Sequence, residues 1–143
     1  MKSYVIDANI LLSGFLSSKV WLYDLLNSNR VFVPEYLNRE LAAYYHLLKS
    51  KRPAVFHHDY SEFRNKLNPL LTIVEHKEIP TEIISQSEWY CRDIDKDDAD
   101  YVAVALHLNI PLLTRDKKLA YGLRGKGFTL VLLLDEWWAD THR

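Results

Sequence analysis

Apolar positions recur with two different spacings along this 143-residue chain. Short runs of apolar and β-branched residues, typical of buried strands, alternate with longer stretches in which apolar residues return every three or four positions, as on one face of a helix. The runs predict strands at residues 3–6, 31–33, 71–74, 112–113 and 128–133. The longer stretches predict helices at 9–16, 20–27, 35–50, a segment through Phe63 and Leu67, 81–92, a stretch from Asp97 or Asp98 to Asn109, and 117–123. Residues 135–138 are predicted to begin a closing helical turn.

The alternation of strands and helices is typical of an α/β fold with a mainly parallel central sheet. We therefore expect a three-layer α/β/α sandwich. The breaks between elements, such as Ser17–Ser18, Pro53 and Asn68–Pro69, are short, and the chain shows no repeats, low-complexity tracts or linker. Residues 1–143 are predicted to form a single domain, which is large enough for one hydrophobic core.

The most informative stretch runs from Asp97 to Asp116. It begins with acids that suit the positive end of a helix, continues with an apolar helix, and breaks at Asn109 and Pro111. The strand at 112–113 follows, and Asp116 comes after its C-terminal end. In open α/β sheets, ligands bind beyond the carboxyl ends of the strands, so Asp116 stands where chemistry is expected.

A second acid holds the same kind of position near the start of the chain, where Asp7 directly follows the strand at 3–6. If the two strands are parallel neighbours, Asp7 and Asp116 face each other across one crevice. Carboxylates so close together repel each other, and a divalent cation relieves the repulsion. Ligands that are all oxygen favour Mg2+ or Mn2+ over zinc. Each acid also has a simpler role open to it, as the N-cap of the helix that follows.

Other acids are weighed by their places on helices. Glu40 lies at the edge of the buried stripe of its long helix, so a surface salt bridge and a place in the site are equally open. Asp98 projects from the inward face of its helix, and Asp95 precedes it on the loop. We expect Asp97 and Asp100 to face solvent.

Composition sets the broad class of the protein. With 48% hydrophobic and 26% charged residues and a formal net charge of -1, the chain is typical of a soluble globular protein and lacks a globally basic nucleic-acid surface. No apolar run approaches the roughly 18 residues of a membrane-spanning helix, and the start lacks the layout of a signal peptide. The one cysteine, Cys91, excludes an internal disulfide, so a cytoplasmic location is expected.

Two local basic clusters bear on nucleic-acid binding. The first consists of Lys49, Lys51 and Arg52, for which a solvated face is the simpler interpretation. The second lies beside the last acid and consists of Arg115, Lys117, Lys118, Arg124 and Lys126. For this cluster, a solvated face and a contact with phosphate are equally open. The four tryptophans are expected in the core or at an interface rather than as base-stacking platforms. The sequence has no HExxH, GxGxxG or P-loop motif and no Cys/His zinc spacing, so zinc catalysis and nucleotide-cofactor binding have no support.

Taken together, these residues resemble the PIN-domain family of metal-dependent nucleases. The segment 5–13 is similar to the opening strand of the family with its first acid, Asp7. Glu40, in the sequence NREL, is similar to the second acid, Asp98 before the alanine-rich helix matches the third, and Asp116 in LTRDKKL matches the fourth. The match covers nearly the whole chain in order, and the opening and closing motifs are fairly specific only in combination.

The resemblance implies a phosphodiesterase that uses Mg2+ or Mn2+ to cut RNA. Many small members are VapC-like toxins of type II toxin–antitoxin pairs, neutralised by a cognate antitoxin protein, and many form homodimers. The implied metal ligands and catalytic residues are Asp7, Asp98 and Asp116, with Glu40 binding directly or through water. The implied supporting residues are Asn9, Asp95 and Thr114, and the implied contacts to RNA phosphate are Arg115, Lys117 and Lys118.

Two other functions stay open at this point. The first is a PIN-like fold that binds RNA or a protein without cutting. The second is a phosphotransfer or receiver-like α/β domain, which needs a phosphorylatable aspartate after a middle strand. Neither Val33-Pro34 nor Val74-Glu75 offers one, which makes this alternative the weaker of the two.

Overall fold

The computed structural model describes residues 1–16, 20–51, 53 and 59–142. The predicted break at Ser17–Ser18 and the basic residue Arg52 lie outside the described residues.

The observed elements follow the predicted alternation. The strands are β1 (Ser3–Ile6), β2 (Arg30–Pro34), β3 (Thr72–Val74), β4 (Leu112–Thr114) and β5 (Val131–Leu133). The α-helices are α1 (Ala8–Leu16), α2 (Val20–Ser28), α3 (Tyr36–Lys51), α4 (Tyr60–Leu67), α5 (Thr81–Cys91), α6 (Ala99–Leu108), α7 (Lys117–Gly125) and α8 (Leu134–Thr141). The 3-10 turns are η1 (Asn68–Leu70), η2 (His76–Glu78) and η3 (Lys96–Asp98).

The predicted start of the last strand is wrong. Strand β5 starts later than the predicted residue 128, because the backbone N–H of Phe128 donates to the carbonyl of Leu123 and so closes the end of α7. The strand therefore starts only after this local helix cap. The closing helix predicted to begin at 135–138 is α8, which buries Trp137 against the core.

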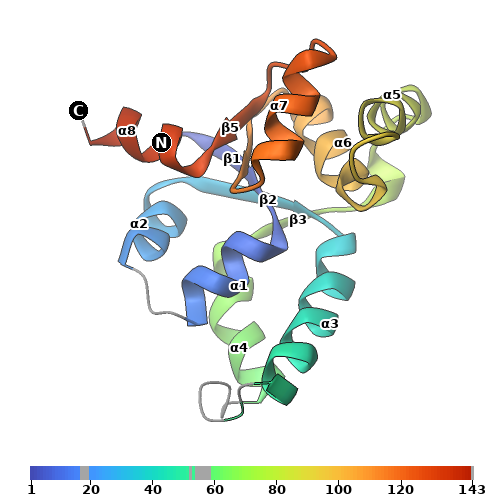
Figure 1. The fold of residues 1–143 in the computed structure, drawn as a ribbon. Helices are drawn as coiled ribbons and strands as arrows, with labels where there is room; N and C mark the ends of the chain where they lie inside the picture. The colour runs from blue at the N-terminus through green and yellow to red at the C-terminus, as the bar shows by residue number, and fades with distance from the viewer. Residues whose placement is uncertain (17–19, 52, 54–58, 143) are drawn as a thin grey trace.

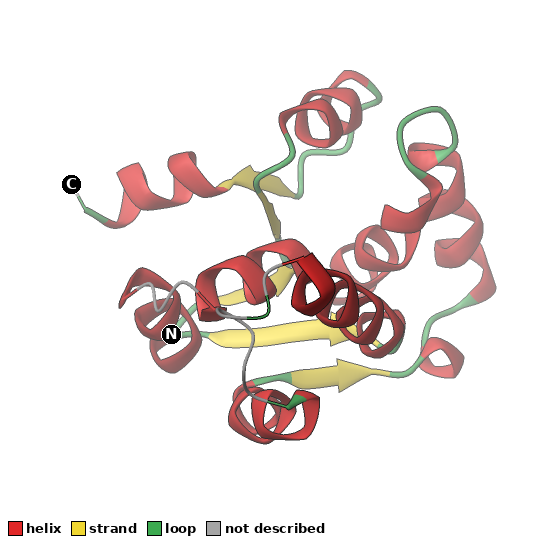
Figure 2. Cartoon of the chain, turned by 60° about the horizontal axis from the view of Figure 1, so that its bottom comes forward, coloured by secondary structure: helices red, strands yellow, loops and turns green. Residues whose placement is uncertain are grey.

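The five strands form one parallel sheet in the order β3-β2-β1-β4-β5. Helices α1, α3 and α4 lie on one side of this sheet and α5, α6 and α7 on the other (Figure 1), and Figure 2 shows the strands between helices. This is the expected α/β/α sandwich with a parallel sheet. The chain builds outward from β1 through β2 to β3 and then returns to the other side of β1 with β4. The direction therefore reverses between β1 and β4, which is the place where open α/β sheets bind ligands.

The central strands are apolar because both sheet faces are covered. Val5 and Ile6 of β1 and all three residues of β4 are buried. Helix α6 is buried on nearly all sides from Tyr101 to Ala105, since it packs between α5 and the sheet. It ends at Asn109, which adopts the left-handed conformation (φ 56°) that closes many helices. Among the described residues, every helix is too short or too polar to span a bilayer.

Candidate active site

The topological switch point brings the first and last predicted acids together. Strands β1 and β4 are parallel neighbours, with Ile6 opposite Leu113. Asp7 follows β1, and Asp116 follows β4 by two residues. The sequence analysis predicted that these acids share one crevice if their strands are neighbours. This prediction is confirmed.

Thr114 joins the two acids. Its side chain is fully buried, and its hydroxyl donates to Oδ2 of Asp7 at 3.0 Å and accepts from the backbone N–H of Asp116 at 3.1 Å. The other oxygen of Asp7 accepts from the N–H of Ile10 at 3.0 Å, and Oδ1 of Asp116 accepts from the N–H of Leu119 at 3.1 Å. Both acids therefore cap the helices that follow them and also border the crevice, so the two roles left open by the sequence coexist.

Glu40 reaches the same crevice from the second turn of α3. Its Oε1 accepts a hydrogen bond of 2.6 Å from the hydroxyl of Tyr101, a side chain that is only 1% exposed. The Tyr101 hydroxyl also has a backbone hydrogen bond with Ala8, at the start of α1. Buried tyrosine hydroxyls need a partner, and here the partner is a carboxylate from an element 61 residues away in the sequence. Tyr101 thus holds Glu40 at the site.

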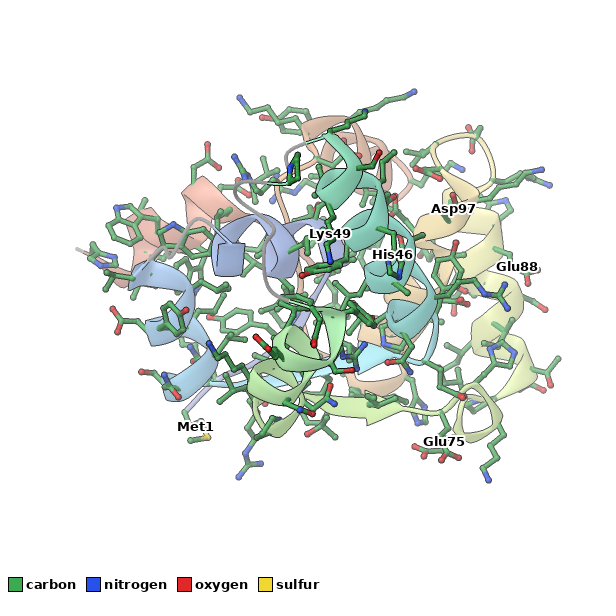
Figure 3. All side chains as sticks on the ribbon, turned by 90° about the horizontal axis from the view of Figure 1, so that it is seen from below. Met1, His46, Lys49, Glu75, Glu88 and Asp97 are labelled. Carbon is green, nitrogen blue, oxygen red and sulfur yellow. The ribbon has the colours of Figure 1, made fainter. Side chains whose placement is uncertain are left out.

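The loop between α5 and α6 supplies the remaining acids. Asp95 caps η3 by accepting from the backbone N–H of Asp97 at 3.0 Å. Asp98 is the N-cap residue of α6, although its side chain makes no capping hydrogen bond. Figure 3 labels Asp97 on this loop, far from Met1 at the other side of the molecule, as expected for a site beyond the carboxyl ends of the strands.

These side chains surround a small cavity of about 70 Å³. Its described lining consists of Asp7, Ala8, Asn9, Glu40, Tyr44, Asp95, Asp97, Asp98, Tyr101 and Asp116. The lining is dominated by carboxylates that come from four separate parts of the chain. The sequence alone had no means of establishing that they meet.

Burial and mutual repulsion make ionisation of this cluster unfavourable. Burial, together with the negative charges of Asp95, Asp7 and Glu40, raises the pKa of Asp98 to about 7. Burial also raises the pKa of Glu40 to about 7, although the hydrogen bond from Tyr101 acts in the opposite direction. The pKa of Asp7 is raised by burial as well, against the lowering effect of its hydrogen bonds. Groups with such shifts in a cavity are typical of functional sites.

The oxygen atoms around the cavity suit a hard divalent cation, because the charged residues of its described lining are all Asp or Glu. A positive ion would also offset the repulsion between these carboxylates. In the described part of the chain, however, no three His, Cys, Asp or Glu side chains are arranged as a formed metal centre. Each of three acids is held by its own hydrogen-bond partners: Thr114 and Ile10 hold Asp7, Leu119 holds Asp116 and Tyr101 holds Glu40. The acids therefore surround a common cavity without converging on one point.

The basic cluster near the last acid divides into two parts. Arg115, Lys117 and Lys118 are exposed on either side of Asp116. Arg124 instead pairs with Glu136 (2.7 Å), and Lys126 pairs with Asp93. The second part of the cluster thus stabilises the fold.

The structure corrects the sequence analysis at several residues. Asp100 is half-buried rather than solvent-facing, whereas Asp97 is exposed as expected and also lines the cavity. Tyr44 of α3, to which the sequence analysis gave no role in the site, also lines the cavity. Tyr101 was missed altogether. Its sequence signal was a hydroxyl on a helix turn otherwise made of alanine and valine, where a buried polar atom requires a partner.

The surroundings of Cys91 do not suit a nucleophile. Cys91 is fully buried, and burial raises the pKa of its thiol to about 12. A thiolate is therefore absent at neutral pH.

The fold and the placement of its acids define the class of protein. The chain belongs to the PIN-domain family, because the family model described as PIN domain matches residues 5–134. PIN domains are generally nucleases and typically use divalent metals. Among solved structures, the chain resembles PAE2754 from Pyrobaculum aerophilum, with a TM-score of 0.67 over 96% of this chain and 93% of that one. The two sequences are 14% identical, so this likeness concerns the fold. No curated protein sequence matches the chain.

Proposed function

We propose that the protein is a Mg2+- or Mn2+-dependent endoribonuclease that hydrolyses RNA phosphodiester bonds. The observation that carries this proposal is the meeting of Asp7, Glu40, Asp98 and Asp116 around one polar cavity at the switch point of the sheet. When bound, a divalent ion lowers the pKa of a water molecule and offsets the negative charge of the phosphate under attack.

The residues of the chain have distinct parts in this proposal. Asp7, Asp98 and Asp116 would hold the ion, with Glu40 binding directly or through water. Thr114 orients Asp7 by its hydrogen bond, and the buried hydroxyl of Tyr101 orients Glu40. Asn9 and Asp95, which also line the cavity, would position water or a second ion. The exposed cations Arg115, Lys117 and Lys118 lie beside Asp116 and would contact the RNA backbone.

Calorimetric titration of Mn2+ tests the metal site directly. We expect the metal-free protein to bind Mn2+ and the Asp7→Asn variant to bind it at least tenfold more weakly, because a neutral amide replaces a charged ligand. Asp24→Asn, which changes an exposed aspartate of α2, is the matched control and should bind like the wild type. Equal binding by Asp7→Asn and the wild type would remove Asp7 from the metal site.

Cleavage is then assayed on total RNA with Mg2+ or Mn2+, comparing the wild type with Asp98→Asn. We expect discrete RNA products with the wild type and none with the variant, whose fold should remain intact. Full cleavage by Asp98→Asn would remove Asp98 from the catalytic set. A wild type that neither binds Mn2+ nor cleaves any RNA would support the second candidate, a PIN domain that binds RNA or a protein without cutting.

We further propose that the protein acts in the cytoplasm as the toxin of a type II toxin–antitoxin pair and forms a homodimer. These proposals rest on the family resemblance. Induced expression should arrest growth, and co-expression of the adjacent gene product should restore it. Sedimentation of the purified protein should give twice the chain mass, 33.6 kDa from two chains of 16.8 kDa. Arrest by Asp98→Asn equal to that by the wild type would contradict a toxic effect through catalysis.

A further inference from the structure

A second hollow lies next to the acidic cavity and differs from it in character. It has a volume of about 420 Å³ and a mostly apolar lining. The described lining residues, which we call the tryptophan groove, are Trp21, Arg115, Lys117, Leu133, Leu134, Asp135, Trp137 and Trp138. They come from the start of α2, the start of α7 and the junction between β5 and α8.

The groove and the acidic cavity share a boundary. Arg115 and Lys117 line the groove, and Asp116, between them in the sequence, lines the acidic cavity. Consecutive Cα atoms are about 3.8 Å apart, so this one segment separates the two hollows. A polymeric ligand bound across Asp116 would therefore place its next monomer at the mouth of the groove.

The groove contains one tryptophan that is held in the core and one whose ring is largely exposed. Trp137 is 4% exposed and packs into the core, whereas Trp138 keeps 46% of its surface exposed. The Trp138 ring is already engaged in a stacked contact with His142, with centroids 3.6 Å apart and planes at 19°. It therefore accepts a flat ring against one face while retaining a large exposed area. Trp21, from α2, completes the aromatic lining.

The charges and dimensions of the groove favour a nucleotide as the occupant. A pocket of this volume suits a ring-sized group, since small-molecule pockets measure roughly 300–1,000 Å³. The described lining carries two cations, Arg115 and Lys117, and one acid, Asp135. The cations lie at the boundary with the acidic cavity, where a phosphate linked to a base in the groove would fall. A base-stacking aromatic surface beside phosphate-binding cations is the usual arrangement for single-stranded nucleic acid.

We propose that the tryptophan groove is a subsite for an unpaired nucleobase of single-stranded RNA, next to the phosphate held at the acidic cavity. This assignment rests on the proposed ribonuclease function. Trp138 stacks on the base, and Lys117 contacts the adjoining phosphate. The groove thereby selects unpaired RNA, because a base held in a duplex is not available to enter it.

The test is fluorescence anisotropy with a labelled ten-nucleotide oligouridylate in EDTA, where no metal-dependent cleavage occurs. Trp138→Leu should bind about tenfold more weakly than the wild type, the effect of losing one stacked base. Trp138→Tyr keeps an aromatic face and should retain most of the affinity. The matched control is Trp89→Leu, because Trp89 is similarly exposed (47%) but lines a different hollow, and it should bind like the wild type. Lys117→Ala should weaken binding and reduce the slope of the logarithm of affinity against the logarithm of salt concentration by about one.

Several outcomes would overturn the assignment. They are wild-type protein that does not bind the oligonucleotide, equal affinity of Trp138→Leu and the wild type, and an equal loss in Trp89→Leu. A change of sedimentation from dimer to monomer in Trp138→Leu, with unchanged RNA affinity, would identify the groove as an interface between copies. Failure of the proposed catalysis gives a different pattern, in which the Trp138 effect on binding persists but the wild type cuts no RNA.

Discussion

Replacement of Asp98 by asparagine should make the metal-free protein more stable at pH 8. Asp98 is half-buried among acids and makes no capping hydrogen bond, so its ionisation is unfavourable in the folded state. Its pKa rises from the ordinary 3.8 to about 7, chiefly through burial, with repulsion from Asp95, Asp7 and Glu40 adding to the effect. Asparagine keeps the shape of the side chain and removes the charge.

The size and pH dependence of the effect follow from the same pKa. A shift of this size corresponds to about 4 kcal/mol at most, at 1.36 kcal/mol per pKa unit. Solvent reaches the half-buried carboxylate and screens its charge, so we expect a gain of about 1–2 kcal/mol in the free energy of unfolding. Between pH 3.8 and about 7 the folded state binds more protons than the unfolded state, so the stability of the wild type falls as the pH rises. The advantage of Asp98→Asn therefore grows over this range and is fully present above pH 7.

Urea denaturation in EDTA, followed by circular dichroism at pH 4, 5, 6, 7 and 8, measures this difference. Asp24→Asn, on the exposed face of α2, is the control and should show no growing difference from the wild type. Saturating Mn2+ should reverse the order, since an ion at one hundred times its Kd stabilises the wild type by about 2.7 kcal/mol. A destabilised Asp98→Asn, or a difference that does not change between pH 4 and 8, would refute the argument that the acids strain the metal-free site.

Two further predictions concern single contacts of the fold. Thr114→Val should lower the free energy of unfolding by about 2 kcal/mol in urea, because it removes a donor to one acid and leaves the backbone N–H of another without its acceptor. Thr129→Val, on the surface, is its control, and equal stabilities would show that this bridge is dispensable. Asn109→Ala should cost about 1 kcal/mol, because alanine is disfavoured at the left-handed φ of 56°. Asn109→Gly should be neutral or stabilising in the same assay, and a loss as large as that of alanine would contradict the backbone explanation.

The sequence by itself determined which elements form and most of their ends, because these depend on neighbours within a few residues. The spacing of apolar residues in 35–50 and 81–92 predicted α3 and α5 to within a residue or two. Asn109 and Pro111 marked the end of α6, and Asp116 was identified as a possible cap for α7, which it is. The acids after the first and fourth strands were recognisable because each follows an apolar run directly or nearly so.

Only the tertiary structure decided which of these residues meet. The hydrogen bond from Thr114 to Asp7 joins positions 107 residues apart, and the bond from Tyr101 to Glu40 joins positions 61 apart. Such pairs depend on the strand order β3-β2-β1-β4-β5, and no local periodicity encodes that order. For the same reason Lys126, a neighbour of the site in sequence, was drawn into an ion pair with Asp93. Local patterns specify a helix or a strand because its hydrogen bonds and buried face repeat every few residues, whereas a site is formed by side chains that become neighbours only when the sheet assembles.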